Sequence, residues 1–260
     1  LSDILSYCRM SFKISFIFGT PFEISYIWDN VGGFKFSTLT SVMKIATNTP
    51  LDKLLDGGIE TDAITNIYGP AGSGKTNIAI STTLANEKRT IYIDTEGSFS
   101  LERYMQLGGD EKKLKKIVFI EPSTWSEQNE KVQNLLSIAD GVGLIVIDSI
   151  VALYRLELSN DNFQHMNRQL ATQYSMLSRI CRKLKVAVLV TNQVYSIGDT
   201  VELTSRTIGK YWSKALIELK KTERDNHRLA ILRKHRSLPE GRKIEFIIEQ
   251  HGLKEAKKWI

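Results

Sequence analysis

The sequence is poor in the residues that hold small folds together covalently or through metals. Its 260 residues include two cysteines, Cys8 and Cys181, and four histidines without ligand spacing. A disulfide scaffold and a zinc site are therefore excluded, and a reducing, cytoplasmic compartment is expected. The most apolar stretch, Ile14 to Phe18, is interrupted by Ser15. Because a spanning helix needs about eighteen apolar residues or more, we expect no membrane span and no membrane partner.

The composition is that of an ordinary globular domain, but the charge is unevenly distributed. Hydrophobic residues make up 42% and charged residues 25% of the chain, whose formal net charge is +6. Residues 204–260 hold fifteen Lys and Arg against seven Asp and Glu. A basic region of this kind is either a solvated surface or a surface that follows a nucleic-acid backbone. The charge alone does not separate these alternatives.

Residues 1–42 differ from the rest of the chain. They begin with Leu, are rich in Phe, Ile, Ser and Tyr, and show no sustained helical or alternating period. Met43 opens a stretch with the turns and strands typical of a domain start. We interpret residues 1–42 as translation upstream of a natural start at Met43, with a genuine strand-forming extension as the alternative. Residues 43–260 are expected to form one domain.

After Met43, short apolar β-branched runs alternate with helical patterns. The runs predict strands at Ile64–Tyr68, Thr90–Asp94, Ile117–Ile120, Leu144–Asp148 and Val186–Thr191. The helical patterns lie at Lys75–Asn86, Ser126–Ala139 and Phe163–Leu184, with Cys181 facing the core. Antiparallel strands are expected at Ala215–Lys220, Arg228–Arg233 and Lys243–Glu249. The fold class is α/β: a mostly parallel twisted sheet, flanked by helices, with antiparallel strands at the C-terminal edge.

A phosphate-binding motif follows the first of these strands. It consists of Gly69, Pro70, Ala71, Gly72, Ser73, Gly74, Lys75 and Thr76, and fits the pattern G-x-x-x-x-G-K-[ST]. Glycines let the backbone amides of such a loop turn inward around phosphate, and the helix that follows adds its positive dipole end. We expect Lys75 to neutralise the β- and γ-phosphates of ATP and Thr76 to ligate Mg²⁺.

Two carboxylates end neighbouring strands of the predicted sheet. Asp148 closes the run LIVID and is expected to hold the water shell of Mg²⁺. Glu96 follows the strand Thr90–Asp94, at the strand end where ligands bind in parallel sheets. It is either a base that deprotonates a water aimed at the γ-phosphate or a surface or helix-capping acid.

Several motifs in order make the chain resemble one family. They are GPAGSGKT, YIDTEGSF followed by LERY, LIVIDS and VAVLVTNQV, together with the preceding LDKLLDGGIETDAITNIYGP. This series is similar to the ATPase core of the RecA-type recombinases, in the archaeal and eukaryotic strand-exchange branch, and extends from about Thr49 to Gly252. The residues before the core show no helix-hairpin-helix domain, and Lys234-His235-Arg236 with Pro239-Glu240-Gly241 follows near the end. The resemblance therefore favours a short archaeal paralogue.

The resemblance implies a RecA-like P-loop NTPase core with defined residue roles. Glu96 would activate the water, Arg103 would stack on adenine, and Gln193 would sense the γ-phosphate and link it to the second DNA-binding loop. The family also implies ATP and Mg²⁺ as cofactors. The expected partners are single- or double-stranded DNA and a full-length RecA-type recombinase.

The chain departs from the family pattern at three places. The segment matching the first DNA loop, Ser159 to Met166, contains no Lys or Arg, and the second loop, Val194 to about Trp212, is short. No Phe-x-x-Ala oligomerisation element precedes the core. We therefore expect neither full strand exchange nor long filaments, although self-association remains compatible with the sequence.

The basic C-terminal region is where the charge and the resemblance meet. The candidate DNA contacts are Arg206, Lys210, Lys214, Arg233, Lys234 and Arg236, with the aromatic rings of Tyr211 or Trp212 stacking on bases. Lys234 and Arg236 have an alternative role, reaching a neighbouring subunit's γ-phosphate, as similar Lys-x-Arg elements do in clock-type and helicase relatives. A solvated strand end is the third interpretation.

The favoured function is an ATP- and DNA-binding recombinase paralogue that assists homologous recombination and DNA repair, with slow DNA-linked ATP hydrolysis. One alternative is a ring-forming helicase-like or clock-type ATPase with the same fold. Another is a nucleotide-gated adaptor that binds ATP without significant turnover. The DTEGSF and TNQV elements favour the recombinase paralogue over the ring-forming ATPase.

Overall fold

The computed structural model describes residues 9–13, 22–28, 34–41, 43–197 and 200–256, and the side chains of residues 43–194, 204, 205 and 207–256. Two compact units are present, Leu1–Met43 and Lys44–Ile260. The first contains an antiparallel sheet of β1 (Arg9–Lys13), β2 (Phe22–Trp28) and β3 (Phe34–Ser41). The favoured interpretation of residues 1–42 included no strands, whereas the alternative named a strand-forming extension without giving bounds. The natural start at Met43 stays a prediction.

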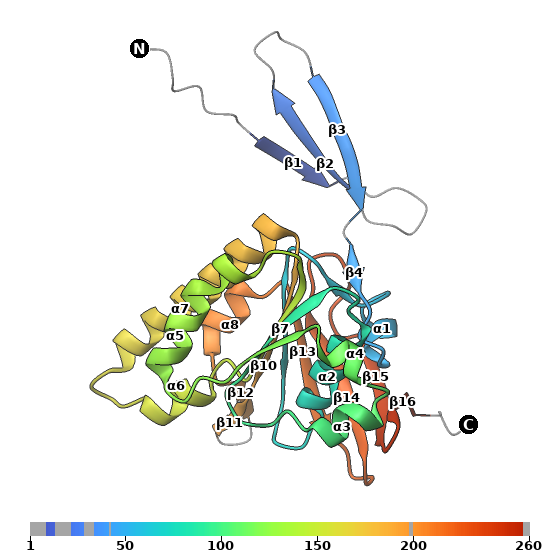
Figure 1. The fold of residues 1–260 in the computed structure, drawn as a ribbon, viewed down its shortest axis with the longest axis vertical. Coiled ribbons are helices and arrows are strands. Elements are labelled where there is room, and N and C mark those ends of the chain that lie inside the picture. Colours follow the sequence, from blue (N-terminus) through green and yellow to red (C-terminus); the bar gives the residue numbers. More distant parts are fainter. Residues whose placement is uncertain (1–8, 14–21, 29–33, 42, 198–199, 257–260) are drawn as a thin grey trace. The chain divides into compact units, whose positions relative to one another are not determined.

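The second unit is built around a nine-stranded sheet with the order β16-β15-β14-β13-β6-β10-β9-β7-β8 (Figure 1). The strands are β6 (Ile64–Tyr68), β7 (Arg89–Asp94), β8 (Ile117–Ile120), β9 (Val142–Asp148), β10 (Ala187–Asn192), β13 (Ala215–Lys221), β14 (His227–Lys234), β15 (Lys243–Glu249) and β16 (Gly252–Glu255). Pairing is parallel from β13 to β8 and antiparallel from β13 to β16. The predicted fold class is confirmed.

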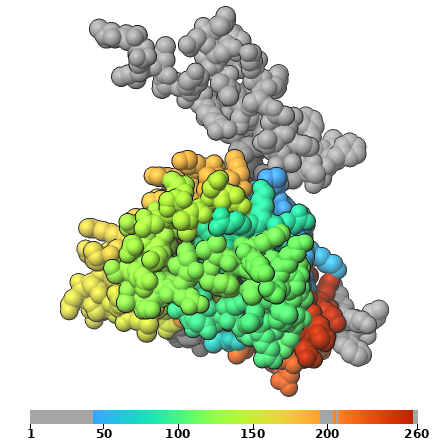
Figure 2. Space-filling view, in the orientation of Figure 1, coloured from blue at the N-terminus to red at the C-terminus, as the bar shows by residue number. Residues whose placement is uncertain are grey.

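Helices cover both faces of this sheet (Figure 1). One face carries α1 (Leu51–Leu54), α2 (Lys75–Ala85), α3 (Leu101–Gln106) and α4 (Glu111–Leu114). The other carries α5 (Trp125–Ile138), α6 (Ala152–Glu157), α7 (Phe163–Leu184) and α8 (Arg206–Trp212). Two short ribbons complete the unit, β4 (Lys44–Ile45) with β5 (Ile59–Glu60) and β11 (Val194–Ile197) with β12 (Thr200–Leu203). In a space-filling view, the segment from α3 to α5 covers much of the visible face (Figure 2).

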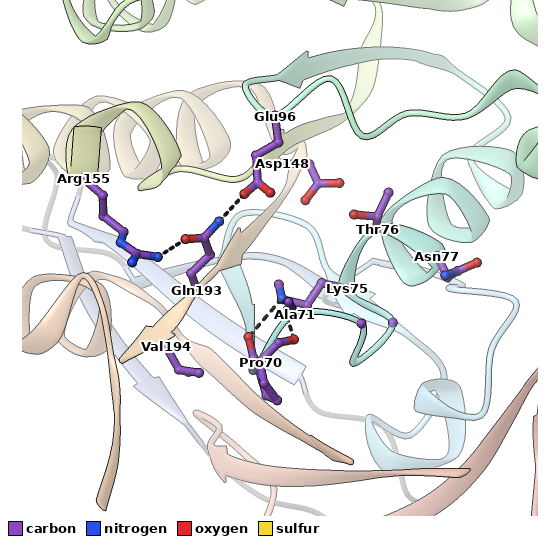
Figure 3. A pocket seen from close by; sticks show the side chains of 13 residues that line it. Pro70, Ala71, Lys75, Thr76, Asn77, Glu96, Asp148, Arg155, Gln193 and Val194 are labelled. Carbon is purple, nitrogen blue, oxygen red and sulfur yellow. Dashed lines mark hydrogen bonds between the residues drawn. The ribbon is translucent and has the colours of Figure 1, made fainter. Parts of the chain in front are cut away.

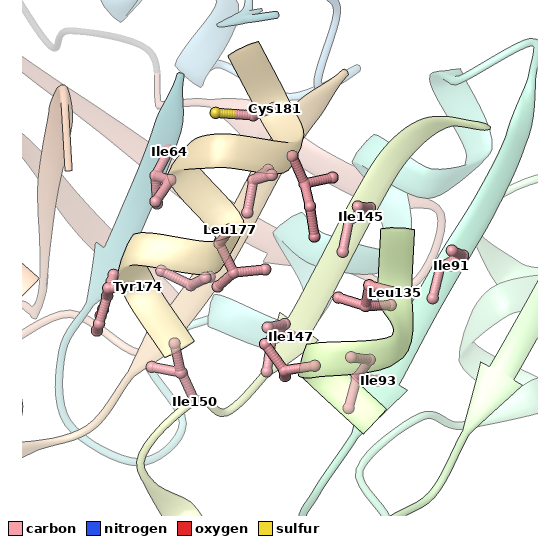
Figure 4. Packing of buried hydrophobic residues seen from close by; sticks show 14 of the residues in the cluster. Ile64, Ile91, Ile93, Leu135, Ile145, Ile147, Ile150, Tyr174, Leu177 and Cys181 are labelled. Carbon is pink, nitrogen blue, oxygen red and sulfur yellow. The ribbon is translucent and has the colours of Figure 1, made fainter. Parts of the chain in front are cut away.

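Successive side chains of the central strands point to opposite faces of the sheet, so the hydrophobic core consists of two layers. Ile145 and Ile147 of β9 pack into the cluster that contains α5 and α7 (Figure 4). Leu144 and Val146 pack into the cluster that contains α1 and α2. Because successive side chains of a strand point to opposite faces, a strand that is apolar at every position needs cover on both sides. Cys181 faces the first cluster, and burial raises the pKa of its thiol to about 11.

The parallel strands direct their polar ends to one edge of the sheet. β6, β7, β9 and β10 end at Tyr68, Asp94, Asp148 and Asn192. Strand register pairs Asp94 with Asp148 and Asn192 with Tyr68. The loops after these strands therefore meet at one edge, which is where ligands bind in open α/β sheets. Within the described residues, no helix is long and apolar enough to cross a membrane.

Candidate nucleotide-binding site

The loop between β6 and α2 packs so closely that two of its glycines are required. A Cβ on Gly69 would lie 2.5 Å from the carbonyl oxygen of Leu219, in β13. Gly74 has φ +100°, and a Cβ there would approach Ile248 at 3.1 Å. Gly74 caps α2 without a side-chain hydrogen bond, and the first turn of α2 contains no acidic residue. The amides of that first turn are therefore available to an anion.

Lys75 is the first residue of α2, and its side chain reaches back to the loop. Its Nζ donates to the carbonyl oxygens of Gly69 at 2.9 Å and Pro70 at 3.0 Å (Figure 3). Burial lowers the pKa of Lys75, while the charges of Glu96 and Asp148 oppose that shift. A partly desolvated ammonium beside two carboxylates is well placed to exchange carbonyl contacts for phosphate oxygens. This arrangement fits the triphosphate of ATP.

Asp148 is held in a fixed orientation by hydroxyl groups. It is 2% exposed. Its Oδ2 accepts from Tyr92 at 3.0 Å and Ser98 at 3.3 Å, and its Oδ1 accepts from Thr191 at 2.5 Å. Burial, followed by the charge of Asp148, raises the pKa of Tyr92 well above its usual value, so this phenol remains a donor.

Asp148 and Thr76 line the same cavity. Mg²⁺ prefers oxygen ligands and usually keeps several waters beside one or two protein groups and substrate phosphates. The hydroxyl oxygen of Thr76 and the carboxylate oxygens of Asp148 are therefore the kind of ligand that Mg²⁺ prefers.

The loop after β7 is shaped by Asp94, whose role the sequence analysis missed. Asp94 is 4% exposed, and its carboxylate accepts from the backbone amides of Glu96 at 3.1 Å, Ser98 at 3.1 Å and Phe99 at 2.8 Å. These bonds curl the chain so that Glu96 enters the cavity. The helix that follows is capped by Ser100, so Glu96 is not its capping acid.

Glu96 is joined to two other side chains in the cavity. Oε1 of Glu96 accepts from Nε2 of Gln193 at 2.8 Å, and Oε1 of Gln193 accepts from the guanidinium of Arg155 (Figure 3). Asn192, which precedes Gln193, is fully buried and donates to Tyr174 at 3.0 Å and Ser205 at 3.2 Å. The backbone of Gln193 is thereby tied to α7 and to the start of α8.

The cavity has a volume of about 360 Å³ and brings most of the predicted nucleotide residues together. Its lining consists of Gly69, Pro70, Ala71, Gly72, Gly74, Lys75, Thr76, Asn77, Glu96, Asp148, Arg155, Gln193 and Val194. Arg155 and Asn77 were not expected from the sequence. Asn77 directly follows the motif, whereas α6, which carries Arg155, had no helical pattern that singled it out.

Arg103, the expected adenine-stacking residue, lies outside that lining. Its guanidinium donates to Asn77 at 2.5 Å and to the backbone oxygens of Glu249 at 2.9 Å and Gln250 at 2.7 Å. These bonds fix the guanidinium between α2 and the turn joining β15 to β16. Burial lowers its pKa. Its stacking role stays a prediction.

The basic residues expected to bind DNA fall into two groups. Arg236 is held at Glu60, 2.5 Å away, and Asp62, 2.9 Å away, with its side chain 22% exposed. Arg233 pairs with Glu218 at 2.5 Å. Both guanidinium groups are therefore paired with carboxylates of this chain. Their contact with DNA stays a prediction.

The remaining lysines lie around α8. Nζ of Lys234 donates to the backbone oxygen of Lys210 at 2.6 Å. Burial and the nearby charge of Lys214 lower the pKa of Lys234. Tyr211 is 73% exposed in the same helix, and its ring contacts Trp212 edge-on with centroids 5.4 Å apart. The side chains of Tyr195 and Arg206 lie outside the described residues.

Comparisons with known proteins agree with this geometry. The Rad51 family model matches residues 38–256. A DNA repair and recombination protein RadB from Methanococcus maripaludis strain C7 is 44% identical over 216 residues, covering 80% of this chain and 99% of the relative. The protein of the same name from Methanobrevibacter smithii is 40% identical over 224 residues, covering 81% and 95%.

A solved structure, described as the crystal structure of the RadB recombinase, superposes with a TM-score of 0.73 at 33% identity. The match covers 82% of this chain and all of the solved chain. Members of this family are typically ATPases that use a nucleotide and Mg²⁺. The predicted resemblance to the RecA-type recombinases is confirmed, and the chain belongs to the Rad51 family.

Proposed function

We propose that this chain is an ATP- and DNA-binding recombinase paralogue that assists homologous recombination and DNA repair. The observation that carries the proposal is the convergence of Lys75, Thr76, Glu96, Asp148 and Gln193 on one cavity. These residues come from four segments of the chain, at or just after the carboxyl ends of β6, β7, β9 and β10. The names of the RadB relatives and the Rad51 family match support the role in recombination and repair.

The proposed reaction is hydrolysis of the γ-phosphate of ATP. Backbone amides of the loop and the ammonium of Lys75 bind the phosphates, while Thr76 and Asp148 would hold Mg²⁺. Bound there, the metal would neutralise charge on the β- and γ-phosphate oxygens. Glu96 takes a proton from the attacking water, and the amide of Gln193 hydrogen-bonds Glu96 and senses the γ-phosphate.

DNA is the proposed second ligand, bound by the lysines around α8. Three lysines lie close together there. Lys234 donates a hydrogen bond to the backbone oxygen of Lys210, and the charge of Lys214 contributes to lowering the pKa of Lys234. Tyr211 offers an exposed ring for stacking on an unpaired base. Lysine clusters attract phosphate without reading sequence, so the proposed binding is sequence-independent and weakens with salt. A full-length RecA-type recombinase is the proposed protein partner.

The position of α8 supports a link between the two ligands. Gln193, which lines the nucleotide cavity, directly precedes β11, and α8 follows β12. A buried hydrogen bond connects Asn192 to Ser205, the residue before α8. The presence or loss of the γ-phosphate at Gln193 can therefore alter the position of α8 and its lysines through the adjoining backbone and this hydrogen bond.

The decisive experiment compares ATP hydrolysis with and without single- and double-stranded DNA, alongside binding to the cognate recombinase. We expect DNA to raise a slow basal rate and the cognate recombinase to bind. ATP binding without hydrolysis under every condition would favour the nucleotide-gated adaptor. Hydrolysis only by a ring-shaped assembly, independent of DNA, would favour the helicase-like or clock-type ATPase.

A further inference from the structure

Arg155 occupies the nucleotide cavity without belonging to any of the motifs that define it. It lies in α6 and lines the cavity together with Glu96, Asp148 and Gln193. Its guanidinium donates to Oε1 of Gln193, and Nε2 of Gln193 donates to Oε1 of Glu96 at 2.8 Å (Figure 3). The three side chains thus form one chain of hydrogen bonds that ends on the proposed base.

The chemistry of the two end groups leaves the middle amide a single orientation. An arginine side chain only donates hydrogen bonds, and an ionised carboxylate only accepts them. The carbonyl oxygen of Gln193 must therefore face Arg155, and its NH₂ group must face Glu96. A phosphate oxygen is also an acceptor. The orientation that serves Glu96 is the same one that presents an N–H donor to a γ-phosphate.

We propose that Arg155 is a positioning residue that fixes the amide orientation of Gln193, so that its nitrogen faces both Glu96 and the γ-phosphate. The inference rests on the proposed function, because it takes this cavity to be an ATP site. Arg155 acts through Gln193 and does not bind the phosphate itself.

Hydrogen bonds of neighbouring residues hold the backbone on both sides of the Arg155–Gln193 pair. Hydrogen bonds attach α6 to α7 and α5: Tyr154 donates to Asn167 of α7 at 3.1 Å, and Glu157 accepts from the backbone amide of Trp125 at 2.8 Å. On the other side, the buried bonds of Asn192 hold the backbone next to Gln193. The side-chain amide of Gln193 is only half-buried. Its orientation therefore depends on the partners at its two ends.

The test uses four variants of the full chain: Arg155→Lys, Arg155→Ala, Gln193→Ala, and the double variant that combines Arg155→Ala with Gln193→Ala. Two measurements are made on each protein: ATP turnover, and the affinity for a non-hydrolysable ATP analogue relative to ADP. For Arg155→Ala we expect turnover and analogue affinity to fall about tenfold. Arg155→Lys, which keeps a donor, should recover part of the loss. ADP lacks the γ-phosphate, so its affinity should be unchanged and reports an intact fold.

The double variant separates positioning from direct phosphate contact. If Arg155 acts through Gln193, then Arg155→Ala should have no further effect in the Gln193→Ala background. A full additional loss in that background would overturn the proposal by assigning Arg155 to the phosphate. Wild-type behaviour of Arg155→Ala would also overturn it, with the proposed function intact. If the wild-type chain does not bind ATP, the proposed function itself fails.

Discussion

Glu96→Gln separates catalysis from nucleotide binding. The substitution keeps the size of the side chain and an oxygen that can accept from Nε2 of Gln193, which now lies 2.8 Å from Glu96. It removes the negative charge and the basic site. General base catalysis contributes roughly 10²-fold to 10⁴-fold, so hydrolysis should fall by about 10²-fold or more. ATP binding should persist, because the proposed contacts with the phosphates are made mainly by Lys75 and the loop amides, which line the cavity and are unchanged in this variant.

The assay is single-turnover hydrolysis at saturating ATP, with binding followed separately using a fluorescent analogue. Single-turnover conditions report the chemical step without product release. Asp94→Asn is an informative second variant, because Asp94 shapes the loop that carries Glu96 without entering the cavity lining. Unchanged turnover in Glu96→Gln would refute the base assignment and leave Glu96 as a surface acid.

Three further perturbations test the phosphate loop, the DNA surface and the core. Lys75→Ala should weaken ATP binding or turnover by about tenfold or more, measured by analogue titration. Lys210→Ala and Lys234→Ala should each weaken single-stranded DNA binding and flatten its log–log salt slope by about 0.7, with little change in basal ATP hydrolysis. Arg236→Ala should lower the free energy of unfolding in urea by about 3 kcal/mol at neutral pH, because Glu60 stays buried without its partner.

Each of these perturbations has a matched control or a contrary outcome. Wild-type ATP affinity in Lys75→Ala would refute the loop assignment. Lys112→Ala removes an exposed lysine of α4, far from α8 in sequence, and should leave the salt slope unchanged. If Lys234→Ala lowered turnover only where the protein self-associates and left DNA binding intact, Lys234 would instead reach a neighbour's nucleotide. For Arg236→Ala, Lys185→Ala is the surface control, since Lys185 lies 3.8 Å from Asp62 and is 63% exposed.

The loss in Arg236→Ala should also depend on pH. Burial raises the pKa of Glu60 above its ordinary value, even though Arg236 opposes that shift. At a pH between the unfolded and the folded pKa of Glu60, the folded state binds more protons than the unfolded state, so the cost of burying this carboxylate falls as the pH falls through the folded pKa. Removing Arg236 increases the difference between the folded and unfolded pKa of Glu60, because Arg236 lowers the folded value. The destabilisation should be smaller at about pH 5 than at about pH 7, and an equal loss at both would contradict the assignment.

The central elements of the fold were predictable because their signals are local. β6, β8, β15 and α7 have the predicted bounds, since a short run rich in β-branched and aromatic residues or a long helical period identifies each of them. The short helices α3, α4 and α6 have four to six residues, too few for a period to emerge. Tertiary contacts determine such helices more than their own sequence does.

The site was predictable where chemistry follows a motif and unpredictable where it depends on distant partners. Lys75, Thr76, Glu96 and Asp148 follow recognisable strands or the phosphate loop, and all line one cavity. Arg155 is 38 residues from Gln193 in the chain, and only the fold brings them together. The pairing of Arg236 with Asp62 joins residues 174 apart in the chain, so sequence charge alone could not show that this predicted DNA contact also holds two parts of the fold together.

Steady-state ATP hydrolysis with and without single-stranded DNA, measured on the wild-type chain beside Lys75→Ala, tests the proposed function most directly. The slow wild-type rate should rise when DNA is added, and the Lys75→Ala rate should stay at background in both cases. A wild-type rate that DNA does not change, in a chain that binds both ligands, would contradict the proposed link between the nucleotide cavity and the lysines of α8.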